Sequence, residues 1–200
     1  MYALIGLIVG VGAALVYLHG DTLFPSENDP NVYHIHANFA MFINGQKFDF
    51  AQEKYMESET QSLSKYVHLH DLDGETIHFH AQNISIGTFL HTLGFEMEEE
   101  TNCVTLDTGE KYCDDDTRTW KVWVNGTKTN EGLNYIPSDL DRVLISYGDE
   151  TNEQLLAQMA RVNDTACIQS EKCPERGTPS EESSCAGSGE CGVGNIPVGN

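Results

Sequence analysis

Three short segments of this chain alternate between apolar side chains and histidines, and this alternation constrains the fold more than any other feature. The histidine pairs are His34 and His36, His68 and His70, and His78 and His80. An alternation with a period of two is typical of a β-strand, in which every second side chain shares a face and lies roughly 6.6–7 Å from the next. Each pair is therefore predicted to present two imidazoles on one side of a sheet.

The second and third pairs are predicted to form one antiparallel hairpin. Residues 71–75 between them read Asp-Leu-Asp-Gly-Glu, which is typical of a turn. Two registers fit, with His68 opposite either His80 or His78, and both place all four imidazoles on one face. A slip by one residue would put the apolar residues of the two strands on opposite faces, so burial of those residues favours the clustered arrangement.

The first pair lies in a third predicted strand, residues 33–43. The odd positions of this segment are all apolar or aromatic, so His34 and His36 fall on the other face of a half-buried strand. Asn44 and Gly45 then predict a tight hairpin turn. This pair joins the other four histidines only if its strand lies beside their hairpin with the same face exposed, which the sequence leaves open.

Imidazoles gathered on one sheet face are a ligand set for a divalent transition metal. Imidazole nitrogen suits Zn²⁺ and Cu²⁺, and a bound ion removes the repulsion between protonated histidines on neighbouring strands. We therefore predict a copper or zinc site, and a solvated polar face without metal is the alternative for any single pair. The primary candidate ligands are His68, His70, His78 and His80, and the conditional ones are His34 and His36. The turn residues Asp71, Asp73 and Glu75 could add an oxygen ligand or orient an imidazole.

The N-terminal segment predicts a membrane anchor. Residues 2–18 are apolar and uncharged, and as a helix they would span about 25 Å. We assign residues 1–20 to a transmembrane helix and 21–32 to a linker, with a cleaved signal peptide as the alternative. The acidic residues that follow are atypical of a cytoplasmic flank, so the rest of the chain is expected at the cell surface. Gly6 and Gly10 have the spacing that packs two such helices together, which makes self-association a further possibility.

The cysteines agree with an exported protein, in which an even number of cysteines favours disulfides. Cys103 and Cys113 lie five residues on either side of Thr108, so a hairpin centred there places them opposite one another. Spacings of six indicate local loops for the remaining four, although the sequence leaves their connectivity open. These four are Cys167, Cys173, Cys185 and Cys191.

The net charge of −20, from 31 acidic and 11 basic residues, excludes one class of partner. Nucleic acid binding requires a basic surface, which this chain lacks. The expected partner is the membrane, through the N-terminal helix. The rest of the chain is not expected to bind it, because an acidic surface is not attracted to anionic lipid.

The order of predicted elements indicates an α+β fold with a mixed sheet and one short helix. Residues 33–66 are assigned to an N-terminal hairpin and a polar surface excursion, residues 67–150 to a second unit, residues 151–164 to a helix and residues 165–200 to an irregular, disulfide-stapled tail. The short helix begins after Ser85, buries a stripe of apolar residues and stops at Gly94. That stripe consists of Ile86, Phe89, Leu90 and Leu93. Strands are expected at 119–124 and 143–147, and a last helix at 152–162 with Leu155, Leu156, Met159 and Val162 on its apolar face.

Three motifs in the second unit carry a resemblance to known domains. They are the helix segment 84–94, Trp-Lys-Val-Trp-Val-Asn-Gly at 120–126, and Asp-Leu-Asp-Arg-Val-Leu-Ile-Ser-Tyr-Gly at 139–148. Their order resembles the β-grasp domains of the transcobalamin-like and soluble-ligand-binding groups. The whole chain also resembles uncharacterised membrane-anchored surface proteins of archaea and small-genome bacteria that have paired His-x-His strands.

The favoured interpretation is a membrane-anchored, extracytoplasmic protein that binds copper or zinc without catalysis. One alternative is a structural or adhesive cell-surface protein, or an assembling filament-type subunit, whose histidines line an interface. A second alternative is a metal-dependent hydrolase or oxidoreductase, in which Glu75 or Asp71 would act as the base.

Overall fold

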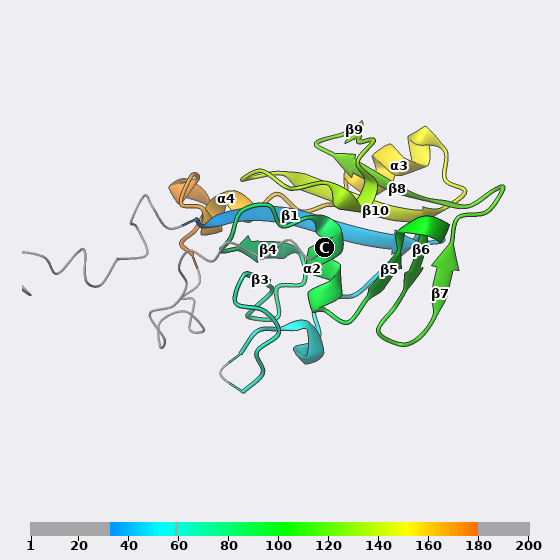
Figure 1. The fold of residues 1–200 in the computed structure, drawn as a ribbon. Helices are drawn as coiled ribbons and strands as arrows, with labels where there is room; N and C mark the ends of the chain where they lie inside the picture. Colours follow the sequence, from blue (N-terminus) through cyan, green and yellow to red (C-terminus); the bar gives the residue numbers. More distant parts are fainter. Residues whose placement is uncertain (1–32, 59, 180–200) are drawn as a thin grey trace, which may run out of the picture.

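A large mixed sheet forms the centre of the molecule (Figure 1). The computed structural model describes residues 33–58 and 60–179. The sheet has the order β3-β4-β1-β10-β8-β9, and β2 pairs with the C-terminal end of β1. Its strands are β1 (Ile35–Ile43), β2 (Gln46–Lys47), β3 (Val67–His68), β4 (Thr76–Phe79), β8 (Thr119–Val124), β9 (Thr127–Lys128) and β10 (Arg142–Gly148).

A small antiparallel sheet and short helices complete the fold. The small sheet contains β5 (Glu96–Glu98), β6 (Cys103–Thr105) and β7 (Lys111–Cys113). The α-helices are α2 (Ile86–Thr92), α3 (Asn152–Met159) and α4 (Ala166–Gln169). Single 3-10 turns occur at Glu53–Tyr55, Glu99–Thr101, Gly132–Asn134 and Pro174–Arg176. The fold is therefore α+β, mostly sheet with few helices, as the sequence predicts.

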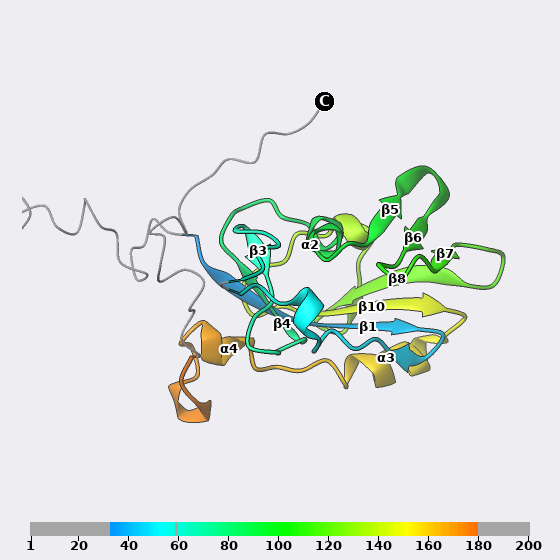
Figure 2. The ribbon, with the colours of Figure 1, turned by 90° about the horizontal axis from the view of Figure 1, so that it is seen from below.

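Both faces of the large sheet are covered. Figure 2 shows α2 and the small sheet on one side and α3 and α4 on the other. Phe39 and Met41 of β1 belong to the main core with α2, whereas Ala40 and Phe42 belong to a second core beneath α3. β1 is consequently buried on both faces, and the prediction of a half-buried strand is wrong because α3 and α4 cover the face that was expected to meet solvent.

α2 has the ends that its sequence indicates, whereas α3 begins at the predicted residue, Asn152, but ends at Met159 rather than at Val162. The Ser85 side chain accepts a hydrogen bond from the Thr88 amide, and Gly94 follows α2 with a φ of +88°. The predicted buried stripe of α2 is confirmed. α3 begins with a capping box between Thr151 and Gln154. Leu156, assigned to the apolar face of this helix, is instead 51 % exposed.

Segments that were assigned to separate units share one sheet and one core. β1, from the predicted N-terminal unit, hydrogen-bonds in antiparallel fashion to β4 and in parallel to β10. The segment expected as a polar surface excursion contributes Tyr55 and Met56 to the main core. The tail expected to be irregular begins with α4, which contacts β1.

Two disulfides stabilise the described part of the chain. Cys103 and Cys113 lie opposite one another on β6 and β7 with Cα atoms 4.0 Å apart, as their spacing predicts. Cys167 and Cys173 close a loop after α4, with Cα atoms 5.5 Å apart.

The remaining predictions concern residues that the structure does not describe. The anchor and linker, residues 1–32, and the cysteines at 185 and 191 lie outside the described residues. Within residues 33–58 and 60–179, none of the helices has the length and apolar character needed to cross a bilayer.

Candidate metal centre

Strand register brings the three histidine pairs to one face of the large sheet. His78 on the middle strand β4 lies directly opposite His36 on β1 and opposite His68 on β3. Of the two registers considered for the hairpin, the one with His68 opposite His78 is present. Because β1 pairs with β4, the first pair also reaches this face, which the sequence alone left open.

The rings on β4 and at the start of β1 are in close contact, where His34 immediately precedes β1. The ring centroid of His36 lies 4.6 Å from that of His34 and 4.5 Å from that of His78, and the His34 and His78 centroids are 6.4 Å apart. Each of these three residues offers one nitrogen such that all three atoms lie within 4.8 Å of one another. Two members of this triad come from the pair whose participation was conditional on strand pairing.

The hairpin rings continue the same cluster. His70 lies against His78, with centroids 3.9 Å apart and His70 Nε2 3.2 Å from His78 Nδ1. His68 lies 5.9 Å from His70 and 4.8 Å from His80. His80 in turn stacks on His34 at 4.5 Å. All six candidate histidines therefore form one continuous group of rings.

Five of the six rings are buried, with His34 half-buried at the edge. The exposed fraction of the other five is between 1 % and 6 %. The alternative of a solvated polar face does not describe these five residues.

The segment that begins α4 lies over the face that carries the histidines. Asn38, two residues after His36 on β1, donates from Nδ2 to Thr165 Oγ1 at 3.2 Å. Its Oδ1 accepts a hydrogen bond from the Ala166 amide at 2.7 Å. Both contacts are on the histidine side of β1, because residues at even positions share that face.

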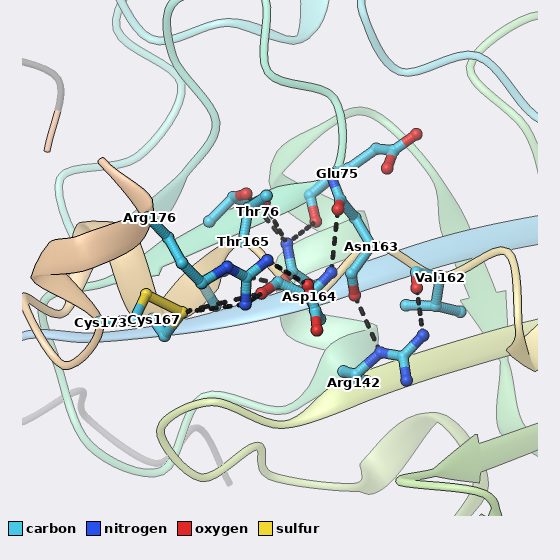
Figure 3. Close-up of polar contacts among 12 residues, drawn as sticks. Glu75, Thr76, Arg142, Val162, Asn163, Asp164, Thr165, Cys167, Cys173 and Arg176 are labelled. Atoms are coloured by element: carbon cyan, nitrogen blue, oxygen red, sulfur yellow. Dashed lines mark hydrogen bonds and ion pairs between the residues drawn. A yellow bond between two sulfur atoms is a disulfide. The ribbon is translucent and has the colours of Figure 1, made fainter. Parts of the chain in front are cut away.

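Further contacts hold this segment, one set to the sheet and one set within the segment itself (Figure 3). The Arg142 guanidinium on β10 donates to the Val162 carbonyl and, at 3.0 Å, to the Asn163 carbonyl. Arg176 donates to the Asp164 carbonyl at 3.0 Å and to its carboxylate at 2.5 Å. The Cys167–Cys173 disulfide lies beside Arg176, and the contact of Arg176 with Asp164 joins the two ends of the loop that this disulfide closes.

Oxygen acceptors define the tautomers of two hairpin histidines. His68 Nδ1 lies 3.1 Å from the Ser64 carbonyl oxygen, and His70 Nδ1 lies 2.9 Å from the Asp71 carboxylate. These oxygens can only accept, so each Nδ1 carries the proton, and in the neutral ring the lone pair is on Nε2. Such contacts are typical of metal-binding histidines, whose second nitrogen donates to a carboxylate or carbonyl.

A serine holds His36 in the same tautomer, with the proton on Nδ1. Its Nδ1 lies 2.7 Å from Ser170 Oγ, and the Ser170 hydroxyl donates to Asp139 Oδ1 at 2.6 Å. With its own proton directed at the carboxylate, Ser170 accepts from His36 Nδ1. This direction is opposite to that of a catalytic triad, in which the serine donates to the histidine. Ser170 is thus a positioning group for His36.

Asp139 is held as a carboxylate. Burial by itself would raise the pKa of Asp139, but hydrogen bonds from Lys172, Ser170 and the His36 amide outweigh burial and hold the pKa below its ordinary value. Ser64, Asp139 and Ser170 were not predicted as site residues. Asp139 and Ser170 lie far from the histidine pairs in sequence and match no motif, and Ser64, four residues before His68, acts through its backbone carbonyl.

The acidic turn residues have different roles. Asp71 orients His70, one of the two functions expected for it. Glu75 pairs with Lys47, and Asp73 accepts a hydrogen bond from the Glu75 amide. His91 lies on α2, on the other side of the sheet, and is exposed, as expected for a solvated helix residue.

The three imidazoles of the triad could hold a metal ion. No family model matches the chain, and no curated protein or solved structure matches it either. The geometry of the histidine cluster is therefore the basis for a functional assignment.

Proposed function

We propose that this chain is a membrane-anchored, extracytoplasmic protein that binds copper or zinc through the histidines of β1, β3 and β4. The observation that carries the proposal is the triad of His34, His36 and His78, whose ligand atoms lie within 4.8 Å of one another. Three imidazoles are the minimum set that holds zinc in many protein sites, and copper binds the same ligands.

The surroundings of the cluster support metal binding. Oxygen acceptors at three of its rings set the tautomer in which Nε2 has the lone pair, as described for His36, His68 and His70. This preorganisation lowers the cost of arranging ligands around an ion. The triad consists of imidazoles alone, which favours a borderline metal over Ca²⁺ or Mg²⁺, since these prefer oxygen.

The location rests on separate support. Two disulfides are compatible with an oxidising compartment outside the cytoplasm. The apolar segment 2–18 is the proposed anchor. We also propose the β-grasp assignment of the sheet, which the parallel pairing of β1 with β10 and the position of α2 across one face support.

Titration of the full-length protein tests the metal proposal. Isothermal titration with Zn²⁺ and Cu²⁺, together with metal analysis after dialysis, would compare the wild type with His36→Ala/His78→Ala and with the matched control His91→Ala. We expect the double variant to bind at least about 100-fold more weakly, since two of three ligands are lost, and the control to bind like the wild type. Equal affinities for all three proteins would contradict the proposal.

A metal-dependent hydrolase is the second candidate, favoured by one observation. A triad of imidazoles leaves a coordination position for water, and the half-buried His34 places the triad at the edge of the cluster. Hydrolysis of a chromogenic ester by the zinc-loaded wild type, lost in His36→Ala/His78→Ala, would support this candidate. Metal binding without turnover would favour the non-catalytic one.

A further inference from the structure

The cluster contains more imidazoles than one metal ion takes. Zinc in proteins is almost always four-coordinate, and the cluster offers six rings in contact with one another. Three of the six histidines lie outside the triad of His34, His36 and His78. The number of ions that the cluster holds is a question that rests on the proposed function, since it presupposes that these histidines bind metal.

The rings form two triangles that share one corner. The first triangle is the triad of His34, His36 and His78, with centroid separations of 4.6, 4.5 and 6.4 Å. The second contains His68, His70 and again His78, with separations of 5.9, 6.0 and 3.9 Å. Imidazoles that bind one tetrahedral ion have centroids roughly 5 Å apart, so the first triangle, whose ligand atoms lie within 4.8 Å of one another, has the size of a ligand set. The second has one close pair, His70 and His78, with the His68 ring further from both.

The shared corner, His78, has a ring nitrogen for each triangle. Its Nδ1 lies 3.2 Å from His70 Nε2, close to the roughly 3.3 Å that separates two nitrogen ligands of one tetrahedral zinc. Because Asp71 holds the proton of neutral His70 on Nδ1, this contact is a hydrogen bond donated by His78 Nδ1. The lone pair of His78 is then on Nε2, the atom that we assign to the first triangle.

From this geometry we infer that the cluster is a two-metal centre in which His78 bridges the ions as an imidazolate. One ion binds His34, His36 and His78; the other binds His68, His70 and the Nδ1 atom of His78. The second ion takes the place of the proton that His78 shares with His70, and this proton leaves to solvent. The ions would lie roughly 6 Å apart, on either side of the His78 ring. The negative charge of the imidazolate would offset the repulsion between them.

The surrounding carboxylates support two ions rather than one. Asp71 contacts His70 of the second triangle, and Asp139 is linked through Ser170 to His36 of the first. Each triangle therefore has one carboxylate beyond its ligands that compensates the charge of a dication. His80 lies between the triangles, 4.5 Å from His34 and 4.8 Å from His68, where it can supply a further ligand to either ion.

Copper stoichiometry and electron paramagnetic resonance test the bridge. Full-length protein in detergent would be titrated with Cu²⁺, and bound copper would be compared with the copper visible by spin quantification. We expect two ions per chain. At full loading, less than half of the copper should be visible, because an imidazolate bridge couples the two unpaired electrons antiferromagnetically.

Single-site variants separate the two positions. His34→Gln and His70→Gln should each bind one copper that is fully visible, whereas the control His91→Gln should behave like the wild type. One ion per wild-type chain, or two ions that are both fully visible, would overturn the bridged centre and leave the proposed function standing. No bound copper would overturn both. Should a variant fail to fold, as judged by circular dichroism, the wild-type stoichiometry and spin count still decide between one ion and two.

Discussion

Asn38 Oδ1 accepts a hydrogen bond from the amide of Ala166, 2.7 Å away and 128 residues further along the chain. The same side chain donates to Thr165 and to Thr76, and it is fully buried. This single amide joins β1, β4 and α4 directly beside His36. The segment that carries Ser170 is thereby held over the histidine cluster.

Replacing Asn38 should loosen this junction. Asn38→Leu preserves the volume but leaves the buried Ala166 amide without its acceptor, which should lower the free energy of unfolding by about 2–3 kcal/mol. Urea unfolding followed by circular dichroism measures this loss. The same substitution at exposed Asn130 is the control and should cost less than about 0.5 kcal/mol. Similar losses at both sites would show that the junction does not contribute as described.

Ser170→Ala should weaken metal binding without unfolding the protein. The substitution removes the acceptor that holds the His36 proton on Nδ1, and loss of such a partner typically costs 10- to 100-fold in affinity, so we expect roughly that decrease. Titration with Zn²⁺ measures it, with unchanged unfolding as the internal check. Ser138→Ala, at an exposed position in the loop before β10, is the matched control. An unchanged affinity in Ser170→Ala would argue against a positioning role.

The two disulfides should differ in their effect on metal binding. Cys167→Ala/Cys173→Ala opens the loop that contains Ser170, so metal affinity should fall together with stability. Cys103→Ala/Cys113→Ala should cost about 3 kcal/mol of stability, as expected for a loop of this length. It should leave metal affinity unchanged, because the small sheet lies on the opposite side of the large sheet from α4. Equal effects on affinity would show that only global stability matters.

Alkaline pH should destabilise the fold through Tyr55. Burial raises the pKa of Tyr55 to about 12, the Asp107 carboxylate adds to this shift, and the Lys54 ammonium opposes it. An unfolded tyrosine ionises near pH 10, so between about pH 10 and 12 the unfolded state loses a proton that the folded state keeps. The contribution is complete below pH 10 and is lost as pH rises through the folded pKa.

Tyr55→Phe checks this prediction. Loss of the hydrogen bond to Asp107 should cost about 1 kcal/mol at pH 7, and the fall in stability between pH 10 and 12 should become shallower. The measurement is the free energy of unfolding in urea across this range. Tyr66→Phe, which removes a tyrosine hydroxyl at another position, is the control for this slope. An unchanged slope in Tyr55→Phe would assign the alkaline effect to other groups.

Local patterns in the sequence were sufficient for the elements themselves. Alternating residues identified the three strands, each of which contains one histidine of a pair with the other within two residues of the strand end, and Ser85 and Gly94 marked the ends of α2. The symmetric placement of Cys103 and Cys113 around one turn identified their disulfide. These features depend on residues close together in the chain. Over such distances the period of a strand or helix determines which side chains share a face.

Tertiary structure decided which elements meet. The sequence could not show that β1 lies between β4 and β10, so it left His34 and His36 conditional and predicted that the face of β1 that carries them would meet solvent. It contained no sign of Asp139 or Ser170, because single polar residues far away in the sequence acquire a role only when packing brings them to a ring nitrogen. Nor did it indicate Ser64, whose contact with His68 is made by a backbone carbonyl. The sequence by itself thus determined the ligand type and the strands that present it, while long-range strand pairing and the docking of α4 determined the cluster.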